Sequence, residues 1–105
     1  MTGEIEPSLF ANWSRLVDLR LSNQFFRGEL PTEIANLISI EQMRLDNNAF
    51  SGTIPTQLSG FQNLTKLFLD SNSFTGLITT EIMELPLQVL RMQNNSFQGF
   101  IPTEI

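Results

Sequence analysis

The sequence predicts a solenoid, in which one short unit recurs along the chain and each copy stacks on the next. The first observation is a row of glycines with spacings of 25, 24, 24 and 23 residues: Gly3, Gly28, Gly52, Gly76 and Gly99. The second is a phenylalanine shortly before each of the later glycines: Phe26, Phe50, Phe74 and Phe97. The third is a pair of apolar residues separated by one position: Leu19/Leu21, Met43/Leu45, Leu67/Leu69 and Leu90/Met92. A unit this short cannot bury its apolar side alone, so neighbouring units must stack.

Each apolar pair predicts a short strand, because alternate residues of a strand point to opposite faces. The apolar residues would face the core, and strands of successive units would pair in parallel about 4.8 Å apart. The segment around each later glycine continues into Leu30-Pro31, Ile54-Pro55, Ile78-Thr79 or Ile101-Pro102. We interpret this segment as extended or as a short second strand, followed at the proline by an irregular or 3₁₀ segment. We expect the phenylalanines to stack as an inner spine.

A side-chain amide follows each strand core by three residues: Gln24, Asn48, Asn72 and Asn95. Where the chain turns away from a sheet, its backbone N–H and C=O groups lose their strand partners. A buried amide can both donate and accept hydrogen bonds, so a ladder of amides can satisfy successive turns. Gln24 is one methylene longer than Asn, and we expect the first turn to be less regular.

The segments LTKLFLDSNSFTGLI and IEQMRLDNNAFSGTIP resemble the leucine-rich repeat of the plant-type extracellular class, and the T-E-I endings are similar to those of algal members. The resemblance implies the α/β repeat class, mostly β and irregular or 3₁₀ structure, as a right-handed superhelix with a parallel sheet on its concave face. We expect one domain, 1–105, with repeats at about 3–27, 28–51, 52–75 and 76–98 and a partial fifth at 99–105. The Cys-paired terminal caps of the family are absent. We therefore expect a fragment whose uncapped ends self-associate or contact a partner.

The composition excludes several classes of function. The 105 residues carry eleven Asp and Glu against six Lys and Arg, a net charge of −5, which argues against a nucleic-acid partner. The chain has no Cys, His or Tyr, so the commonest general base and the commonest metal ligand are missing. We expect no enzyme activity, no cofactor and no metal site. No apolar run is long enough to cross a membrane as a helix, so we expect no direct membrane insertion.

The outward residues of the predicted strands are the candidate ligand site, because the fold does not need them. The residue inside each apolar pair forms one row: Arg20, Arg44, Phe68 and Arg91. Lys66 precedes this row, and Asp46 and Asp70 follow it. Guanidinium groups suit carboxylate, sulfate or phosphate groups, and an exposed Phe68 would be an apolar anchor. The pattern predicts a peptide or protein ligand with acidic groups.

The alternative interpretation of this face is a solvated ladder of charges. In it, Arg20 pairs with Asp18 or Asp46, and Arg44 pairs with Asp46 or Asp70. Such pairs would serve the sheet and leave less charge for a ligand.

The leading hypothesis is a recognition module of a receptor-like or secreted protein, outside the cell or at its surface. Three glycosylation sequons, at Asn12, Asn63 and Asn94, favour a secreted glycoprotein. One alternative is a structural accessory subunit of a larger assembly, in an organelle or inside the cell. Others are an inhibitor of a cell-wall hydrolase and an ice-binding protein, for which threonines recur once per unit: Thr32, Thr56, Thr80 and Thr103.

Overall fold

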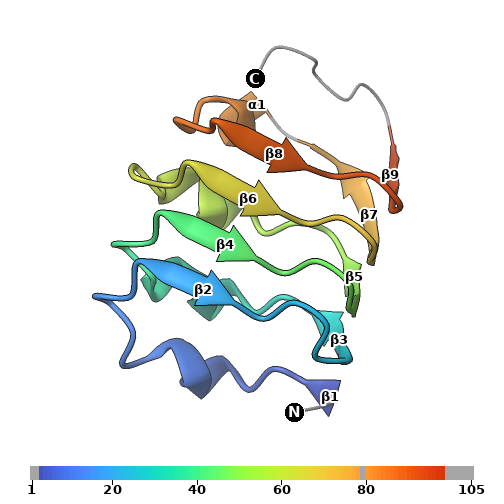
Figure 1. Ribbon diagram of the computed structural model, residues 1–105, viewed down its shortest axis with the longest axis horizontal. Coiled ribbons are helices and arrows are strands. Elements are labelled where there is room, and N and C mark those ends of the chain that lie inside the picture. The colour runs from blue at the N-terminus through green and yellow to red at the C-terminus, as the bar shows by residue number, and fades with distance from the viewer. Residues whose placement is uncertain (1–2, 79, 99–105) are drawn as a thin grey trace.

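The computed structural model describes residues 3–78 and 80–98, and within them the chain winds into stacked coils (Figure 1). The first parallel sheet, here named the concave sheet, consists of β2 (Asp18–Arg20), β4 (Gln42–Arg44), β6 (Lys66–Phe68) and β8 (Val89–Arg91). The second parallel sheet consists of β1 (Gly3–Glu4), β3 (Phe26–Glu29), β5 (Ala49–Gly52), β7 (Ser73–Leu77) and β9 (Ser96–Gln98). The predicted solenoid is confirmed, and the glycine segment, left open between extended chain and strand, forms a sheet of its own.

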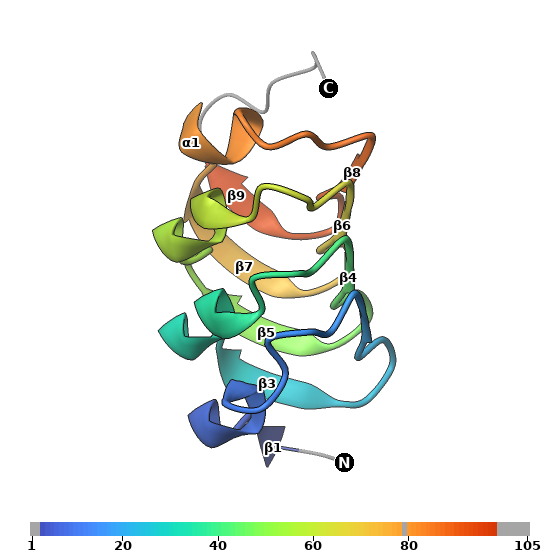
Figure 2. The same cartoon turned by 90° about the vertical axis from the view of Figure 1, so that its left-hand side faces the viewer.

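Short helical turns close the coils on the side opposite the concave sheet (Figure 2). The 3₁₀ helices are η1 (Pro7–Phe10), η2 (Thr32–Asn36) and η3 (Thr56–Gly60), whereas α1 (Thr80–Met83) is one α-helical turn. Pro31 and Pro55 stand immediately before η2 and η3 with extended backbone, where proline fixes the turn and no N–H is needed. Among the described residues, no helix is long and apolar enough to cross a membrane.

The core contains the expected aromatic spine. The ring centroids lie 5.9 Å apart for Phe26–Phe50, 6.0 Å for Phe50–Phe74 and 6.1 Å for Phe74–Phe97, with interplanar angles of 16°, 15° and 11°. Phe50 and Phe74 are fully buried, and Ile34, Leu58 and Ile82 are buried where the helical turns pack against the core. Each coil therefore stacks its aromatic residue on the next one, which couples neighbouring coils.

The asparagine ladder is confirmed at three of its four positions. Asn72 Nδ2 donates to the carbonyl oxygens of Leu45, Leu69 and Asp70 at 2.9, 3.2 and 3.2 Å, and its Oδ1 accepts from the N–H of Phe50 at 3.0 Å. Asn48 and Asn95 make the same kind of contacts in their own coils. Each asparagine thus reaches back to the preceding coil as well as to its own.

Within the described residues, Gln24 does not repeat the ladder contacts of the asparagines, and the first turn is less regular, as expected. Its side chain is exposed, and its Nε2 donates to the carbonyl of Ser22 at 3.2 Å. The equivalents of Leu21 and Phe26 one coil earlier, which a ladder residue here would contact, fall outside the described residues. The longer side chain bends back to its own turn instead.

A residue with a left-handed backbone lies three residues after each strand of the concave sheet and one residue before the ladder position. The positive φ values are 59° at Asn23, 56° at Asn47, 57° at Ser71 and 60° at Asn94. Asparagine tolerates this region better than other non-glycine residues, which explains its recurrence here. Gly76 has a φ of 84°, and a Cβ there would lie 2.8 Å from Cγ2 of Thr53. This recurring glycine is required both by its backbone angle and by the close approach of the preceding coil.

Candidate recognition site

The concave sheet aligns the predicted row of outward residues. Its register pairs Arg20 with Arg44, Arg44 with Phe68, and Phe68 with Arg91. The preceding row is also in register, with Lys66 between Gln42 and Val89. The inward neighbours Leu19, Met43 and Leu67 are buried, so the alternation of each strand turns the row away from the core.

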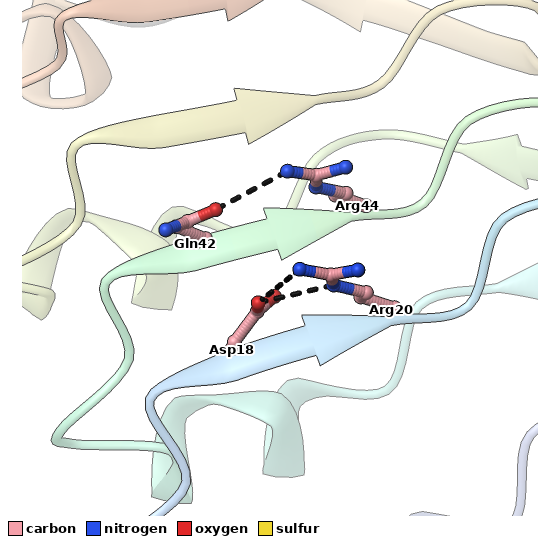
Figure 3. Close-up of polar contacts among 4 residues, drawn as sticks. All are labelled: Asp18, Arg20, Gln42 and Arg44. Atoms are coloured by element: carbon pink, nitrogen blue, oxygen red, sulfur yellow. Dashed lines mark hydrogen bonds and ion pairs between the residues drawn. The ribbon is translucent and has the colours of Figure 1, made fainter.

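Arg20 is engaged by its own strand. Its Nε donates to Oδ2 of Asp18 at 3.0 Å, and one terminal guanidinium nitrogen lies 2.9 Å from the same oxygen (Figure 3). The hydrogen bond to Asp18, followed by the attraction between the two charges, raises the pKa of Arg20. The charge-ladder alternative is thus correct for Arg20, which is largely neutralised by Asp18.

Arg44 lies one strand further along and has a different partner. It donates to the side-chain oxygen of Gln42 at 3.3 Å (Figure 3). The expected ion pairs of Arg44 with Asp46 or Asp70 are absent from the described residues. The reason is geometric, since Gln42 is two residues away on the same outward face, whereas both aspartates follow the end of a strand.

Phe68 forms the centre of the site. The guanidinium carbon of Arg44 lies 5.3 Å from the ring centroid, and that of Arg91 lies 4.8 Å from it. Because these arginines come from the strands on either side of β6, the ring is flanked by two cations. Each contact contributes about 0.5–1 kcal/mol at an exposed site and holds the guanidinium in place without neutralising it. The ring is half-buried and therefore available in part to a ligand.

The positive charge of the site is concentrated on β4, β6 and β8. Among the described residues, Arg44, Lys66 and Arg91 form no ion pair, in contrast to Arg20. A chain with a net charge of −5 thus presents three cations on adjacent strands, two of them against one aromatic ring. This arrangement suits a ligand with acidic groups and at least one apolar or aromatic group.

Of the two aspartates of the following row, Asp46 has side-chain contacts within the fold, whereas Oδ1 of Asp70 is buried without a hydrogen-bond partner in the described part of the structure. Asp46 Oδ1 accepts from the hydroxyl of Ser22 at 2.7 Å, and its Oδ2 accepts from Nδ2 of Asn47 at 3.1 Å. Asp70 is half-buried beside the next turn, and its backbone carbonyl accepts from Asn72. Within the described residues, no cluster of three or more acidic, His or Cys side chains could hold a metal ion.

The three sequon asparagines, Asn12, Asn63 and Asn94, are exposed. Asn94 lies in the left-handed turn after β8, and its Nδ2 donates to the hydroxyl of Ser71 at 3.4 Å. A glycan at Asn94 would therefore lie at the edge of the concave sheet, beside Arg91.

The structure shows one feature that the sequence indicated only weakly. Phe25 is 78% exposed and has a φ of 61°, and an open groove lies beside it. The sequence indicated that Phe25 is exposed only because small residues, Ala49 and Ser73, stand at the equivalent positions of the next two coils. The left-handed backbone of Phe25 had no sequence signal.

Comparison with protein families matches residues 39–61, 63–85 and 86–105 to the Leucine Rich Repeat family. These segments make up more than half of the chain, which therefore belongs to the leucine-rich repeat family. A search of curated protein sequences finds no match.

The fold is similar to plant leucine-rich repeat structures. The ectodomain of the Arabidopsis thaliana membrane receptor kinase GASSHO1/SCHENGEN3, in complex with CASPARIAN STRIP INTEGRITY FACTOR 2, is 36% identical with a TM-score of 0.90. That match covers 96% of this chain and 12% of the receptor chain. The Arabidopsis receptor kinase HAESA, in complex with the peptide hormone IDA and the co-receptor SERK1, is 34% identical with a TM-score of 0.86, over 98% of this chain and 17% of HAESA.

The structure of a plant ice-binding protein is also similar, with 30% identity and a TM-score of 0.81 over 91% of this chain and 31% of that one. The chain therefore spans a small part of the length of each of these proteins.

Proposed function

We propose that this chain is a recognition module that binds a peptide, or an extended segment of a protein, across the concave sheet. The observation that carries the proposal is the flanked ring, with Phe68 between the guanidinium groups of Arg44 and Arg91. The ring supplies apolar contact area, and the two guanidinium groups supply planar donors for carboxylates. The aromatic contacts restrict the arginines before the ligand arrives, which reduces the entropy lost on binding.

The comparisons support this proposal for the class of protein, because similar leucine-rich repeat structures bind partners. The similar GASSHO1/SCHENGEN3 ectodomain and receptor kinase HAESA are both in complex with partners, which for HAESA include a peptide hormone. The ectodomain neighbours and the exposed sequons together support a location outside the cell for the parent protein. We infer that the site lies on coils two to four, because Arg20 of the first concave strand is engaged by Asp18.

The Phe68→Ala variant is expected to weaken peptide binding by about tenfold, since buried aromatic anchors contribute on the order of 1–2 kcal/mol or more. Linear peptides are selected from a random display library on the immobilised chain, and the dissociation constant of the best peptide is measured by titration calorimetry. Enrichment of acidic peptides is expected. The matched control is Ile38→Ala, which removes an apolar side chain that is 68% exposed outside the strands of the concave sheet. Equal affinity for Phe68→Ala and wild type would contradict the proposal.

Ice binding is the second candidate, and one observation favours it. The strands β5, β7 and β9 contain no charged residue, and the hydroxyl residues Ser73, Thr75 and Ser96 are exposed on them. Parallel strands repeat such groups at about 4.8 Å, and an uncharged face loses little hydration free energy when it meets a neutral surface. Thr32 and Thr56 of the row predicted from sequence are exposed at the start of η2 and η3, whereas the side chain of Thr80 and all of Thr103 lie outside the described residues.

Thermal hysteresis of a freezing solution separates this candidate from peptide recognition. If the second sheet binds ice, a solution of the wild type freezes below its melting temperature. The Thr75→Lys variant is expected to abolish this difference, because it places a hydrated charge on the sheet. Phe68→Ala serves as the control and is expected to keep the difference. No hysteresis in the wild type excludes this candidate.

A further inference from the structure

An open groove of about 460 Å³ lies where the chain leaves the concave sheet and enters the second sheet. Its volume falls within the range of small ligand sites, roughly 300–1,000 Å³. Its walls come from three successive coils: Phe25, Arg27, Asn47, Asn48, Ala49 and Ser71. The strands β4, β6 and β8 of the proposed peptide site contribute none of these residues.

Phe25 stands at one side of the groove in an unfavourable backbone conformation. Its φ of 61° lies in the left-handed region, which bulky residues rarely adopt. The ring is 78% exposed, because its equivalents in the next coils, Ala49 and Ser73, are too small to cover it. An aromatic side chain held in this way is characteristic of binding sites, where the surrounding structure stabilises a strained residue.

Asn48 holds Phe25 in this conformation. Its Oδ1 accepts from the N–H groups of both Gln24 and Phe26, at 3.0 and 3.1 Å, which fixes the backbone on either side of Phe25. In the next coil, the equivalent contact of Asn72 is to the N–H of Phe50, and Ala49 has no positive φ. The first coil therefore has a different turn, which presents the ring of Phe25 in a preorganised position.

Arg27 gives the groove its charge. It is exposed, and it forms no ion pair with any carboxylate of residues 3–78 and 80–98. Two carboxylates lie near it in the sheet, on its register partner Glu4 and on Glu29 of its own strand. Their side chains extend over Gly28 and Gly52, with Cγ 2.8 and 2.6 Å from the position of a Cβ there. No residue that lines the groove is acidic. Arg27 is therefore the charged residue in the groove lining and supplies the donor for a carboxylate.

We propose that this groove is a second binding site, which takes a peptide segment bearing an aromatic side chain next to a free or side-chain carboxylate. The aromatic ring packs on Phe25 in an offset arrangement, above the small side chain of Ala49. The carboxylate faces the guanidinium of Arg27, which can donate two parallel hydrogen bonds to it. The site goes beyond the concave sheet and stands whether or not that sheet binds a ligand.

The probe for this site is N-acetyl-L-phenylalanine in its carboxylate form, titrated into the full ¹⁵N-labelled chain and followed by amide chemical shifts. Saturable shifts are expected at Arg27, Ala49 and Ser71. The carboxamide analogue is expected to bind about tenfold more weakly, because it lacks the charge that Arg27 complements. Phe25→Ser, which copies the residue of the equivalent position at Ser73, and Arg27→Gln are each expected to weaken the carboxylate by about tenfold.

Ile38→Ala is the matched control, because Ile38 is an exposed apolar residue that does not line the groove, and it is expected to bind the probe like the wild type. The amide spectra of all variants report directly whether each one is folded. The proposal is overturned if the shifts do not saturate, if Phe25→Ser binds as well as the wild type, or if only Phe68→Ala loses the probe. The last result would place the probe on the concave sheet.

Discussion

Phe50→Ala is expected to lower the free energy of unfolding by about 3–5 kcal/mol, the usual cost of removing a buried aromatic side chain. Phe50 is fully buried, and its ring stacks on those of Phe26 and Phe74 at 5.9 and 6.0 Å. Its removal leaves a cavity between two coils and interrupts the spine at its middle. Urea denaturation followed by circular dichroism measures the change.

Phe25→Ala is the control for this measurement, because the same side chain is removed from a position that is 78% exposed. It is expected to change stability by no more than about 0.5 kcal/mol, as surface substitutions usually do. Similar losses in the two variants would show that the stacked phenylalanines do not carry the contact between coils.

Asn72→Ala is expected to lower the free energy of unfolding by about 2–4 kcal/mol, because each polar group left unpaired in a buried turn costs about 1–3 kcal/mol. The N–H of Phe50 loses its acceptor, and the carbonyls of Leu45, Leu69 and Asp70 lose a donor. Urea denaturation gives the global loss, and hydrogen exchange of the Phe50 amide reports the local one.

The control is Asn36→Ala, in which an exposed asparagine at the end of η2 is removed. It is expected to alter stability by less than about 0.5 kcal/mol and to leave the exchange of the Phe50 amide unchanged. An Asn72→Ala variant as stable as this control would contradict the role of the ladder, since side chains of the same chemistry would then contribute equally at both positions.

The fold and the alignment of the outward row could be predicted from the sequence, because both depend on periodicity. The glycine period sets the length of a coil, and the alternation around Leu19, Met43, Leu67 and Leu90 sets which residues face outward. Parallel pairing then brings Arg44, Phe68 and Arg91 side by side. The ladder at Asn48, Asn72 and Asn95 follows from the chemistry of an amide at a turn.

The partners within the site could not be predicted in the same way. The sequence offered two aspartates as partners for Arg44, and the choice of Gln42 depends on rotamers that only the packed sheet determines. The contact of Gln24 with Ser22 of its own turn likewise depends on a side-chain conformation that residue type alone does not determine. The conformation of Phe25 depends on two hydrogen bonds to Asn48 of the next coil, a non-local contact without a sequence signature.

In the proposed function, Arg44, Phe68 and Arg91 together form the peptide-binding surface. The most direct measurement follows the side-chain Nε–H signals of the arginines by NMR while an acidic peptide selected on the chain is added. The signals of Arg44 and Arg91 are expected to shift in a saturable manner, with the dissociation constant obtained by calorimetry. The signal of Arg20, whose Nε is engaged by Asp18, is expected to change little. If the peptide saturates the chain while the Arg44 and Arg91 signals stay unchanged, this proposal is contradicted.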